Sequence, residues 1–342
     1  MLPIQTGLLA YGMSGRVFHA PFLSTSPLFG LRAVVERHRQ TAVQTYPDII
    51  SYDSVAALLA DDVLELVVIN TPNDTHFALA RQALLAGKHV LIEKPVATTP
   101  AELDELLALA TRQQRHLLAY QNRRWDSDFQ LVRQVVESGR LGRLTEVHFR
   151  FDRYKVALNP KQFKEDAAAP GSGLSFDLGP HVLDQALSLF GEPAHSRFTR
   201  ASHRPNSRVD DYFHAHLEYP EGLHVFVTGS LLTAAAGPAY VLHGTAGSFQ
   251  KNRTDVQETQ LVAGILPTTA SYGHEPAGAE GVLTLATEPG HFQTELLPAP
   301  ASNYAGLFDA VYQTIRHAQP FPVTPEQLRW QLEILAGPNP QG

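Results

Sequence analysis

The first third of the chain alternates between continuous apolar runs and segments with helical spacing. The apolar runs lie at residues 4–12, 30–36, 65–72, 89–95 and 116–123. Residues 76–88 and 100–115 between them repeat their apolar positions at helical intervals, and Gly87 and Pro100 suit a helix end and a helix start. Continuous apolar strands that alternate with amphipathic helices predict a parallel sheet covered by helices on both faces, an α/β fold.

From about residue 122 the pattern changes. Helical spacing returns in residues 128–139, 176–191 and 303–318. Apolar and polar residues alternate instead in residues 143–156, 210–219, 222–232, 239–251 and 255–262. Period-two runs that follow one another predict a mainly antiparallel sheet and hence an α+β domain. The segment 264–290, rich in Gly, Ala, Pro and Thr, is expected to be a long loop.

The change of pattern predicts two domains, residues 1–121 and residues 122–342. A length of 342 residues agrees with two domains, and 44% hydrophobic with 18% charged residues is ordinary for a soluble globular protein. A net charge of −7 gives no sign of nucleic-acid binding. The chain has no cysteine, which excludes disulfides, thiolate metal sites and a cysteine nucleophile. No segment approaches the length of a membrane span, so we expect a cytoplasmic protein without membrane or nucleic-acid partners.

A glycine-rich turn follows the first apolar run. The sequence AYGMSG, residues 10–15, nearly matches G-x-G-x-x-G, with Ala10 at the first glycine position. Gly12 would allow a pyrophosphate to approach the backbone, and Gly15 would allow close helix packing. The following helix start offers N–H groups to phosphates. We therefore expect a dinucleotide to contact the turn through Tyr11, Gly12, Met13, Ser14 and Gly15.

The end of the second apolar run carries charged residues. Glu36 lies about 20 residues beyond the glycine turn, where an acidic side chain binds the ribose diol of NAD. Arg37, His38 and Arg39 follow, a composition expected around the 2′-phosphate of NADP. Glu36 favours NAD and Arg37 keeps NADP open, so the cofactor is expected to be NAD(H) or NADP(H).

The third apolar run ends in NTPNDTHF, residues 70–77. The backbone of this turn, at Thr71, Pro72 and Asn73, is expected to touch the cofactor at the carboxyl end of the strand. Asn73 or Asp74 equally suits a simple helix cap. His76 is open to the same two interpretations.

Beyond these single motifs, the chain resembles the glucose–fructose oxidoreductase/inositol dehydrogenase (Gfo/Idh/MocA) oxidoreductases. The resemblance lies in GMSGRVFHAPFL, TPNDTHFALARQALLAGKHVLIEKP, NRRWDSDF and GSGLSFDLGPHVLDQALSLFG, in the family's order, and extends to PFPVTPEQL near the C-terminus. The segments FHAP and NRRWDSDF are most similar to the NADP-dependent scyllo-inositol dehydrogenase branch. Two positions depart from the pattern: Ala10 replaces a common glycine, and Glu36 stands where NADP-using relatives have a smaller residue.

The resemblance implies a fold and a reaction. The fold would be an N-terminal Rossmann domain followed by an open-faced, mainly antiparallel sheet domain for substrate binding and oligomerisation. The reaction would be NAD(P)-dependent hydride transfer to or from a secondary hydroxyl of a cyclitol, sugar or derivative. The open sheet predicts a homodimer or homotetramer, because it otherwise leaves apolar surface in water.

Hydride transfer from an alcohol requires a base for the hydroxyl proton and a group that favours the alkoxide. Asp177 and His181 are four residues apart near a helix start and would project from one face; such spacing is more often a surface pair than a catalytic dyad. Lys94 ends its strand at the sheet edge where ligands bind, although a charged strand exit followed by Pro95 is the simpler interpretation. The family resemblance assigns Lys94, Asp177 and His181 to catalysis, with His181 as proton acceptor.

Other polar residues have weaker assignments. Glu93 is expected to fix Lys94 or the cofactor edge. Asn122 and Arg124, at the domain crossover, are expected to reach the nicotinamide, and Arg124, Trp125 and Arg153 the polyol, although Trp125 also suits packing. His214 and His216 share a strand face without a third ligand, so no metal is expected.

Two other functions share this fold. Some relatives are glycosidases that hold NAD tightly and use it in a closed redox cycle, and others are non-catalytic nucleotide sensors. A sensor does not need Lys94, Asp177 and His181, so their presence favours an enzyme.

Overall fold

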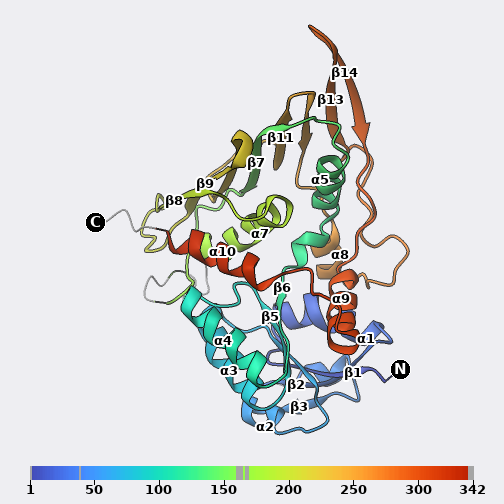
Figure 1. The fold of residues 1–342 in the computed structure, drawn as a ribbon. Coiled ribbons are helices and arrows are strands. Elements are labelled where there is room, and N and C mark those ends of the chain that lie inside the picture. Colours follow the sequence, from blue (N-terminus) through green and yellow to red (C-terminus); the bar gives the residue numbers. More distant parts are fainter. Residues whose placement is uncertain (1, 38–39, 159–164, 166–168, 338–342) are drawn as a thin grey trace. The chain divides into compact units, whose positions relative to one another are not determined.

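The computed structural model describes residues 2–37, 40–158, 165 and 169–337. These residues form two packing units, which are treated separately (Figure 1). The first unit comprises residues up to 122 together with 256–273 and 303–325, and the second comprises the remainder. Sequence analysis predicted one boundary, after residue 121; by packing, the two later segments join the first unit.

The first unit is built on a parallel sheet of strand order β3-β2-β1-β4-β5-β6. Its strands are β1 (Ile4–Leu8), β2 (Phe29–Val35), β3 (Ile50–Tyr52), β4 (Leu66–Ile69), β5 (His89–Glu93) and β6 (Leu117–Tyr120). All of β4 is buried, which explains why its sequence is continuously apolar. Because the strand order reverses beside β1, a crevice for a ligand is expected at the carboxyl ends of β1 and β4.

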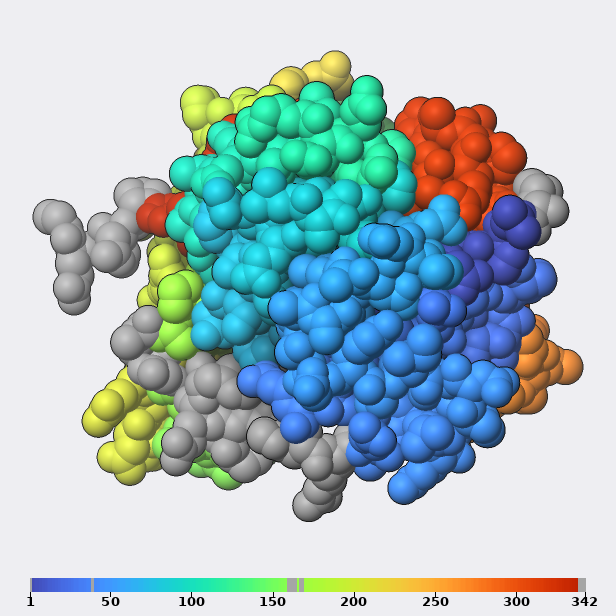
Figure 2. Space-filling model, turned by 90° about the horizontal axis from the view of Figure 1, so that it is seen from below, coloured from blue at the N-terminus to red at the C-terminus, as the bar shows by residue number. Residues whose placement is uncertain are grey.

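Helices lie on both sides of this sheet (Figure 1). They are α1 (Ala20–Thr25), α2 (Val55–Leu59), α3 (His76–Leu85) and α4 (Pro100–Arg112), joined later in the chain by α8 (Gln257–Val262) and α9 (Ala305–His317). The α4 helix begins where expected, with Pro100 in its first turn and the Thr99 hydroxyl accepting from the Glu102 N–H. In Figure 2 the blue-to-cyan segments of this unit form most of the visible surface, with the red-orange α9 beside the N-terminal segment.

An aromatic cluster explains why α9 belongs to the first unit. The ring of Phe308 stacks on Phe22 at 5.2 Å and meets the edge of Phe29 at 6.1 Å. At the surface, the guanidinium of Arg316 makes two 2.8 Å hydrogen bonds to the carboxylate of Glu65. The helix supplies the last apolar side chains for this side of the sheet, although it is more than 180 residues from β6 in sequence.

The second unit holds a sheet of order β14-β13-β12-β11-β7-β10-β9-β8, antiparallel except for the β7–β10 pair. The strands are β7 (Leu144–Asp152), β8 (His195–Ala201), β9 (Tyr212–Tyr219), β10 (Leu223–Ser230), β11 (Tyr240–Gly244), β12 (Gly247–Lys251), β13 (Gly281–Glu288) and β14 (His291–Leu297). One face packs on helices that include α5 (Ser127–Glu137) and α7 (Gly179–Phe190); α6 (Leu174–Asp177) and α10 (Pro325–Ala336) are also present. Buried and partly exposed residues alternate strictly along β9, so the opposite face is open.

The predicted fold class, a parallel α/β domain followed by a mainly antiparallel α+β domain, is confirmed. Two local predictions are wrong. Residues 257–262 form helix α8, because the buried Gln257 and Leu261 are four residues apart and lie on one helix face. The expected loop 264–290 contains all of β13, which pairs with both β12 and β14.

Candidate active site

The turn after β1 has the close packing expected of a nucleotide-binding turn. A Cβ atom added at Gly15 would lie 2.3 Å from the carbonyl oxygen of Ala10, so only glycine fits there. At Gly12 an added Cβ would meet nothing within 4 Å, which leaves that backbone open to a ligand. The side-chain amide of Asn70 holds the turn, since it accepts from the Ala10 N–H at 3.1 Å and donates to the Ala10 carbonyl at 2.8 Å.

A cavity of about 720 Å³ opens beside this turn, within the first unit. Its lining includes predicted cofactor contacts and residues that the sequence did not single out: Leu9, Ala10, Tyr11, Gly12, Met13, Arg16, Val35, Glu36, Arg37, Thr41, Gln44, Thr45, Thr71 and Pro72. Arg16 and Arg37 are both exposed and bring positive charge to the cavity. Volume, glycine backbone and cationic lining together fit a dinucleotide.

Glu36 is held by its own unit. Its carboxylate accepts hydrogen bonds from the Thr41 N–H at 2.9 Å, the Thr41 hydroxyl at 2.7 Å, the Ala42 N–H at 3.2 Å and the Ser51 hydroxyl at 3.0 Å. Burial raises the pKa of Glu36, but these hydrogen bonds outweigh it and keep the pKa below its ordinary value. Because a carboxylate accepts about four hydrogen bonds, Glu36 has little capacity left for a ribose diol.

Glu93 ties the end of β5 to the glycine turn. Its carboxylate accepts from the Ser14 hydroxyl at 2.6 Å and from Nε2 of His19 at 2.9 Å. Burial raises the pKa of Glu93, but the hydrogen bonds from His19 and Ser14, with the nearby charges of His19 and Lys94, bring it below the ordinary value. An ionised Glu93 therefore braces the strand end that carries Lys94, which is half-buried and directly follows β5.

His76 is fully buried and joins two backbone segments. Its Nδ1 lies 2.7 Å from the Pro95 carbonyl and its Nε2 lies 2.9 Å from the Thr71 carbonyl. Burial lowers the pKa of His76, and a neutral ring donates to only one of these carbonyls at a time. The side chain thus positions the segments around Lys94 and Thr71, and it does not line the cavity described above. Asn73, also expected at the cofactor, opens a short 3₁₀ turn over Asn73–Thr75 and likewise does not line that cavity.

In the second unit, Asp177 is the last residue of α6 and His181 lies in the first turn of α7. The helical segment is divided at Leu178, whereas sequence analysis expected one continuous helix. His181 is only 7% exposed, and Asp177 is half-buried. Upstream, Gly173 has a φ of 85°, and the carboxylate of Asp210 accepts from the Ser175 N–H at 2.6 Å, which fixes the start of α6.

Arg124 lies in a buried ion pair of the second unit. Its Nε and Nη2 donate to the two carboxylate oxygens of Asp184, each at 2.7 Å, and Nη2 also donates to Gln327 at 2.8 Å. The side chains of Arg124 and Asp184 are 5% and 3% exposed. Arg124 belongs to the short 3₁₀ helix Asn122–Trp125. In that helix Asn122 is buried and Trp125 is half-buried.

Arg153 belongs to a cationic cluster around one ring. The guanidinium groups of Arg253, Arg153 and Arg123 lie 4.1, 5.0 and 5.2 Å from the centre of the Phe151 ring. Arg253 was not found by sequence analysis, because it follows β12 and is about 100 residues from Phe151. Arg123 is paired with the carboxylate of Asp126 at 3.2 Å, and the three guanidinium groups around one ring make this part of the second unit well suited to polar or anionic groups.

Comparison with known protein families gives two matches. Residues 4–121 match the oxidoreductase family with an NAD-binding Rossmann fold, and residues 129–250 match the GFO/IDH/MocA C-terminal domain. Within the part of the chain that the structure describes, no helix is long and apolar enough to cross a membrane.

Relatives align over nearly the whole chain. The uncharacterised oxidoreductase YdgJ of Escherichia coli is 36% identical over 97% of this chain and 94% of its own. The scyllo-inositol 2-dehydrogenase (NADP(+)) IolW of Bacillus subtilis is 31% identical over 95% of this chain and 89% of its own. Among solved structures, the oxidoreductase yvaA of Bacillus subtilis is similar with a TM-score of 0.93 at 30% identity, covering 98% of this chain and 95% of that one.

Proposed function

Because this chain belongs to the Gfo/Idh/MocA family of oxidoreductases, we propose that it transfers hydride between an NAD(P) cofactor and a secondary hydroxyl of a cyclitol or sugar. The chain is a dehydrogenase or reductase that binds NAD(H) or NADP(H). The observation that carries the proposal is the cavity beside Gly12 and Gly15, which has the backbone and charge that a dinucleotide requires.

Three side chains are proposed to act on the substrate. A bound nicotinamide supplies the hydride acceptor or donor. The Lys94 ammonium donates a hydrogen bond to the reacting oxygen and so stabilises the alkoxide. His181 accepts the hydroxyl proton in oxidation and returns it in reduction, and Asp177 orients the imidazole. Arg153 is proposed to bind further substrate hydroxyls from the cationic cluster around Phe151.

Relatives support a cyclic polyhydroxylated substrate. One relative acts on scyllo-inositol by its name, and another is the bovine trans-1,2-dihydrobenzene-1,2-diol dehydrogenase, 30% identical over 62% of this chain and 62% of its own. Both names describe six-membered rings that carry neighbouring hydroxyl groups. A site lined by several donors and acceptors discriminates strongly among such hydroxyl patterns.

The test is an absorbance assay at the nicotinamide band. Purified protein is screened with NAD and with NADP against inositols, aldoses and sugar acids. Reduction of one cofactor with one stereochemical class supports the proposal. Tight cofactor binding without net reduction across the panel contradicts it, and turnover of a glycoside under those conditions would indicate a closed redox cycle.

We propose NADP(H) as the preferred cofactor. Arg37 lines the cavity, whereas the carboxylate of Glu36 already accepts from backbone N–H and hydroxyl groups of residues 41–51. Arg37→Ala is expected to raise the KM for NADP about tenfold and to leave the KM for NAD nearly unchanged, since only the 2′-phosphate loses a charged hydrogen bond. Steady-state kinetics with both cofactors measure the two values.

Glu36→Gln provides the control for cofactor choice. Glutamine keeps two acceptor positions for the donors of residues 41–51 but loses the charge, so the KM values for both cofactors are expected to rise together. If Glu36→Gln raised the KM for NAD but not the KM for NADP, Glu36 would bind the ribose diol, as sequence analysis expected.

We also propose a cytoplasmic homo-oligomer, a dimer or tetramer, joined through the β13–β14 end of the open sheet face. Phe292 and Leu296 of β14 are 70% and 62% exposed, and Val282 of β13 is 38% exposed. Such a patch favours association with a second copy. Light scattering is expected to give a multiple of 37.5 kDa for the wild type and a lower mass for Phe292→Asp/Leu296→Asp. A monomeric wild type would contradict the proposed oligomer. Cell fractionation tests the proposed cytoplasmic location.

A further inference from the structure

Histidine and glutamate alternate across the open face of the second sheet. His195 of β8 is paired with Glu218 of β9, and Glu218 is paired with His224 of β10. His224 is in turn paired with Glu146 of β7, which is paired with His243 of β11. Directly paired residues have Cβ atoms about 5 Å apart, so imidazoles and carboxylates meet along this row. Such a row offers many ligands to a cation.

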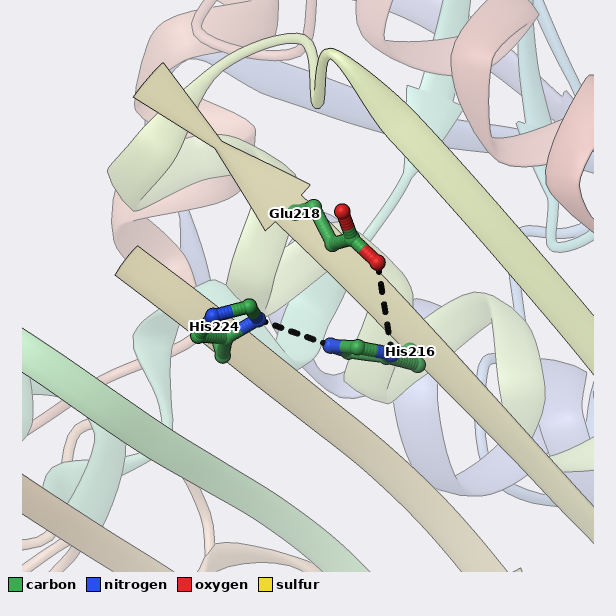
Figure 3. Close-up of side chains that lie close together, drawn as sticks. All are labelled: His216, Glu218 and His224. Atoms are coloured by element: carbon green, nitrogen blue, oxygen red, sulfur yellow. Dashed lines mark hydrogen bonds and ion pairs between the residues drawn. The ribbon is translucent and has the colours of Figure 1, made fainter. Parts of the chain in front are cut away.

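Two of these side chains, Glu218 and His224, converge with His216, which precedes Glu218 by two residues on the same face (Figure 3). Nε2 of His216 lies 3.0 Å from Nδ1 of His224, and Nδ1 of His216 lies 3.7 Å from a carboxylate oxygen of Glu218. The His216 ring stacks on Phe226 at 4.7 Å with an interplanar angle of 17°, which restricts its rotation. Ligand atoms of these three polar residues all lie within 4.8 Å of one another.

We propose that His216 and His224, supported by Glu218, bind a divalent transition-metal ion, with Zn²⁺ as the best fit. Imidazole nitrogen and carboxylate oxygen are ordinary zinc ligands. Two nitrogens bound tetrahedrally at about 2.0 Å from zinc lie roughly 3.3 Å apart, close to the 3.0 Å between His216 and His224. To change from the described hydrogen bond to a metal-binding pair, the two rings must also turn so that both nitrogen lone pairs point at one ion.

Glu218 has a defined role in this site. One of its carboxylate oxygens lies 3.7 Å from Nδ1 of His216, within ion-pair distance but beyond hydrogen-bond distance, so its negative charge favours the tautomer that carries the proton on Nδ1 and leaves the lone pair of Nε2 for the ion. A carboxylate that orients a metal-binding histidine in this way usually strengthens metal binding about ten- to hundredfold. It also adds negative charge beside His216, which is paired on the other side with Arg197 of β8.

Sequence analysis considered a different pair of histidines as metal ligands. His214 and His216 share a strand face, but Nδ1 of His214 lies 3.0 Å from the hydroxyl of Thr228 and so has a local partner. The second imidazole of the site is His224, eight residues beyond His216 on the next strand. Only the register of the β9–β10 hairpin brings the two rings together. These residues do not line the cavity of the first unit, so the proposed metal site is separate from the proposed cofactor site.

The test is calorimetric titration of the full chain, first stripped with a chelator, with Zn²⁺. The wild type is expected to bind one equivalent per chain. His216→Ala and His224→Ala are expected to lose that binding, and Glu218→Gln to weaken it about tenfold. His214→Ala is the matched control, because it removes a histidine of the same strand and face without removing a ligand, and it is expected to bind as the wild type does.

Thermal unfolding gives a second readout, because a ligand that binds the native state raises its Tm. Zn²⁺ is expected to raise the Tm of the wild type and of His214→Ala but not that of His216→Ala or His224→Ala. The proposal is overturned if the wild type binds no zinc, or if the variants at His216 and His224 bind it unchanged. Equal loss in His214→Ala would also overturn it, since binding would then reflect scattered surface histidines.

Discussion

Replacing Lys94 by alanine is expected to lower kcat by about a hundred- to a thousandfold, the usual effect of removing a hydrogen-bond donor from a developing oxyanion. Lys94 directly follows β5, at the carboxyl end of a parallel strand, where ligands of such sheets bind. Glu93, braced by Ser14 and His19, holds that strand end in place. The cofactor Kd, measured by fluorescence titration, is expected to change far less than kcat.

Lys88 provides a matched control at the opposite end of the same strand. Its side chain is 5% exposed, and its ammonium donates to the carbonyls of Asp61 at 2.8 Å and Leu64 at 2.9 Å. Lys88→Ala removes the ammonium that donates to the buried carbonyl of Leu64, whereas the carbonyl of Asp61 keeps the Leu64 N–H as a donor, so it is expected to lower the Tm while the folded fraction keeps its kcat. Lys94→Ala should show the opposite pattern. Near-normal turnover in Lys94→Ala would show that Lys94 is only a charged strand exit.

The strands of the first unit could be predicted because burial on both faces makes their sequences continuously apolar, as in β4 and β5. The prediction for residues 255–262 failed because a short amphipathic segment satisfies both the period-two and the helical pattern, and tertiary packing decides between them. The strand β13 was hidden in a segment rich in turn-forming residues. Its pairing with β12 is non-local, and its pairing with β14 is a hairpin whose turn holds Pro289 and Gly290, which sequence analysis counted as part of the loop.

The glycine turn could be predicted because its constraint is local: the Cβ clash at Gly15 involves Ala10, five residues away. The long-range hydrogen bonds that support the turn could not be predicted from the sequence. Asn70, which holds Ala10 by two hydrogen bonds, lies 60 residues along the chain. Glu36 was placed correctly at the end of its strand, but the donors at Thr41, Ala42 and Ser51 depend on how the following loop folds back.

Arg124→Ala is expected to destabilise the second unit by about 3–5 kcal/mol, because it leaves the buried carboxylate of Asp184 without its partner. Sequence analysis assigned Arg124 to the cofactor and the polyol, but its Nε and Nη2 both donate to Asp184, and Nη2 also donates to Gln327. The measurement is urea unfolding followed by far-ultraviolet circular dichroism.

A double-mutant cycle with Asp184→Ala separates stability from ligand binding. Removing both charges leaves no unpaired buried ion, so Arg124→Ala/Asp184→Ala is expected to be much less destabilised than the sum of the single variants. Arg133, which carries its guanidinium 5.4 Å from the Phe129 ring on α5, supplies an arginine control. Arg133→Ala is expected to cost less, because it breaks a cation–π contact and leaves no buried carboxylate behind. The opposite outcome is that Arg124→Ala keeps its stability and raises the KM for cofactor or substrate. The ion pair with Asp184 would then not stabilise the second unit, and Arg124 would contact the ligand directly.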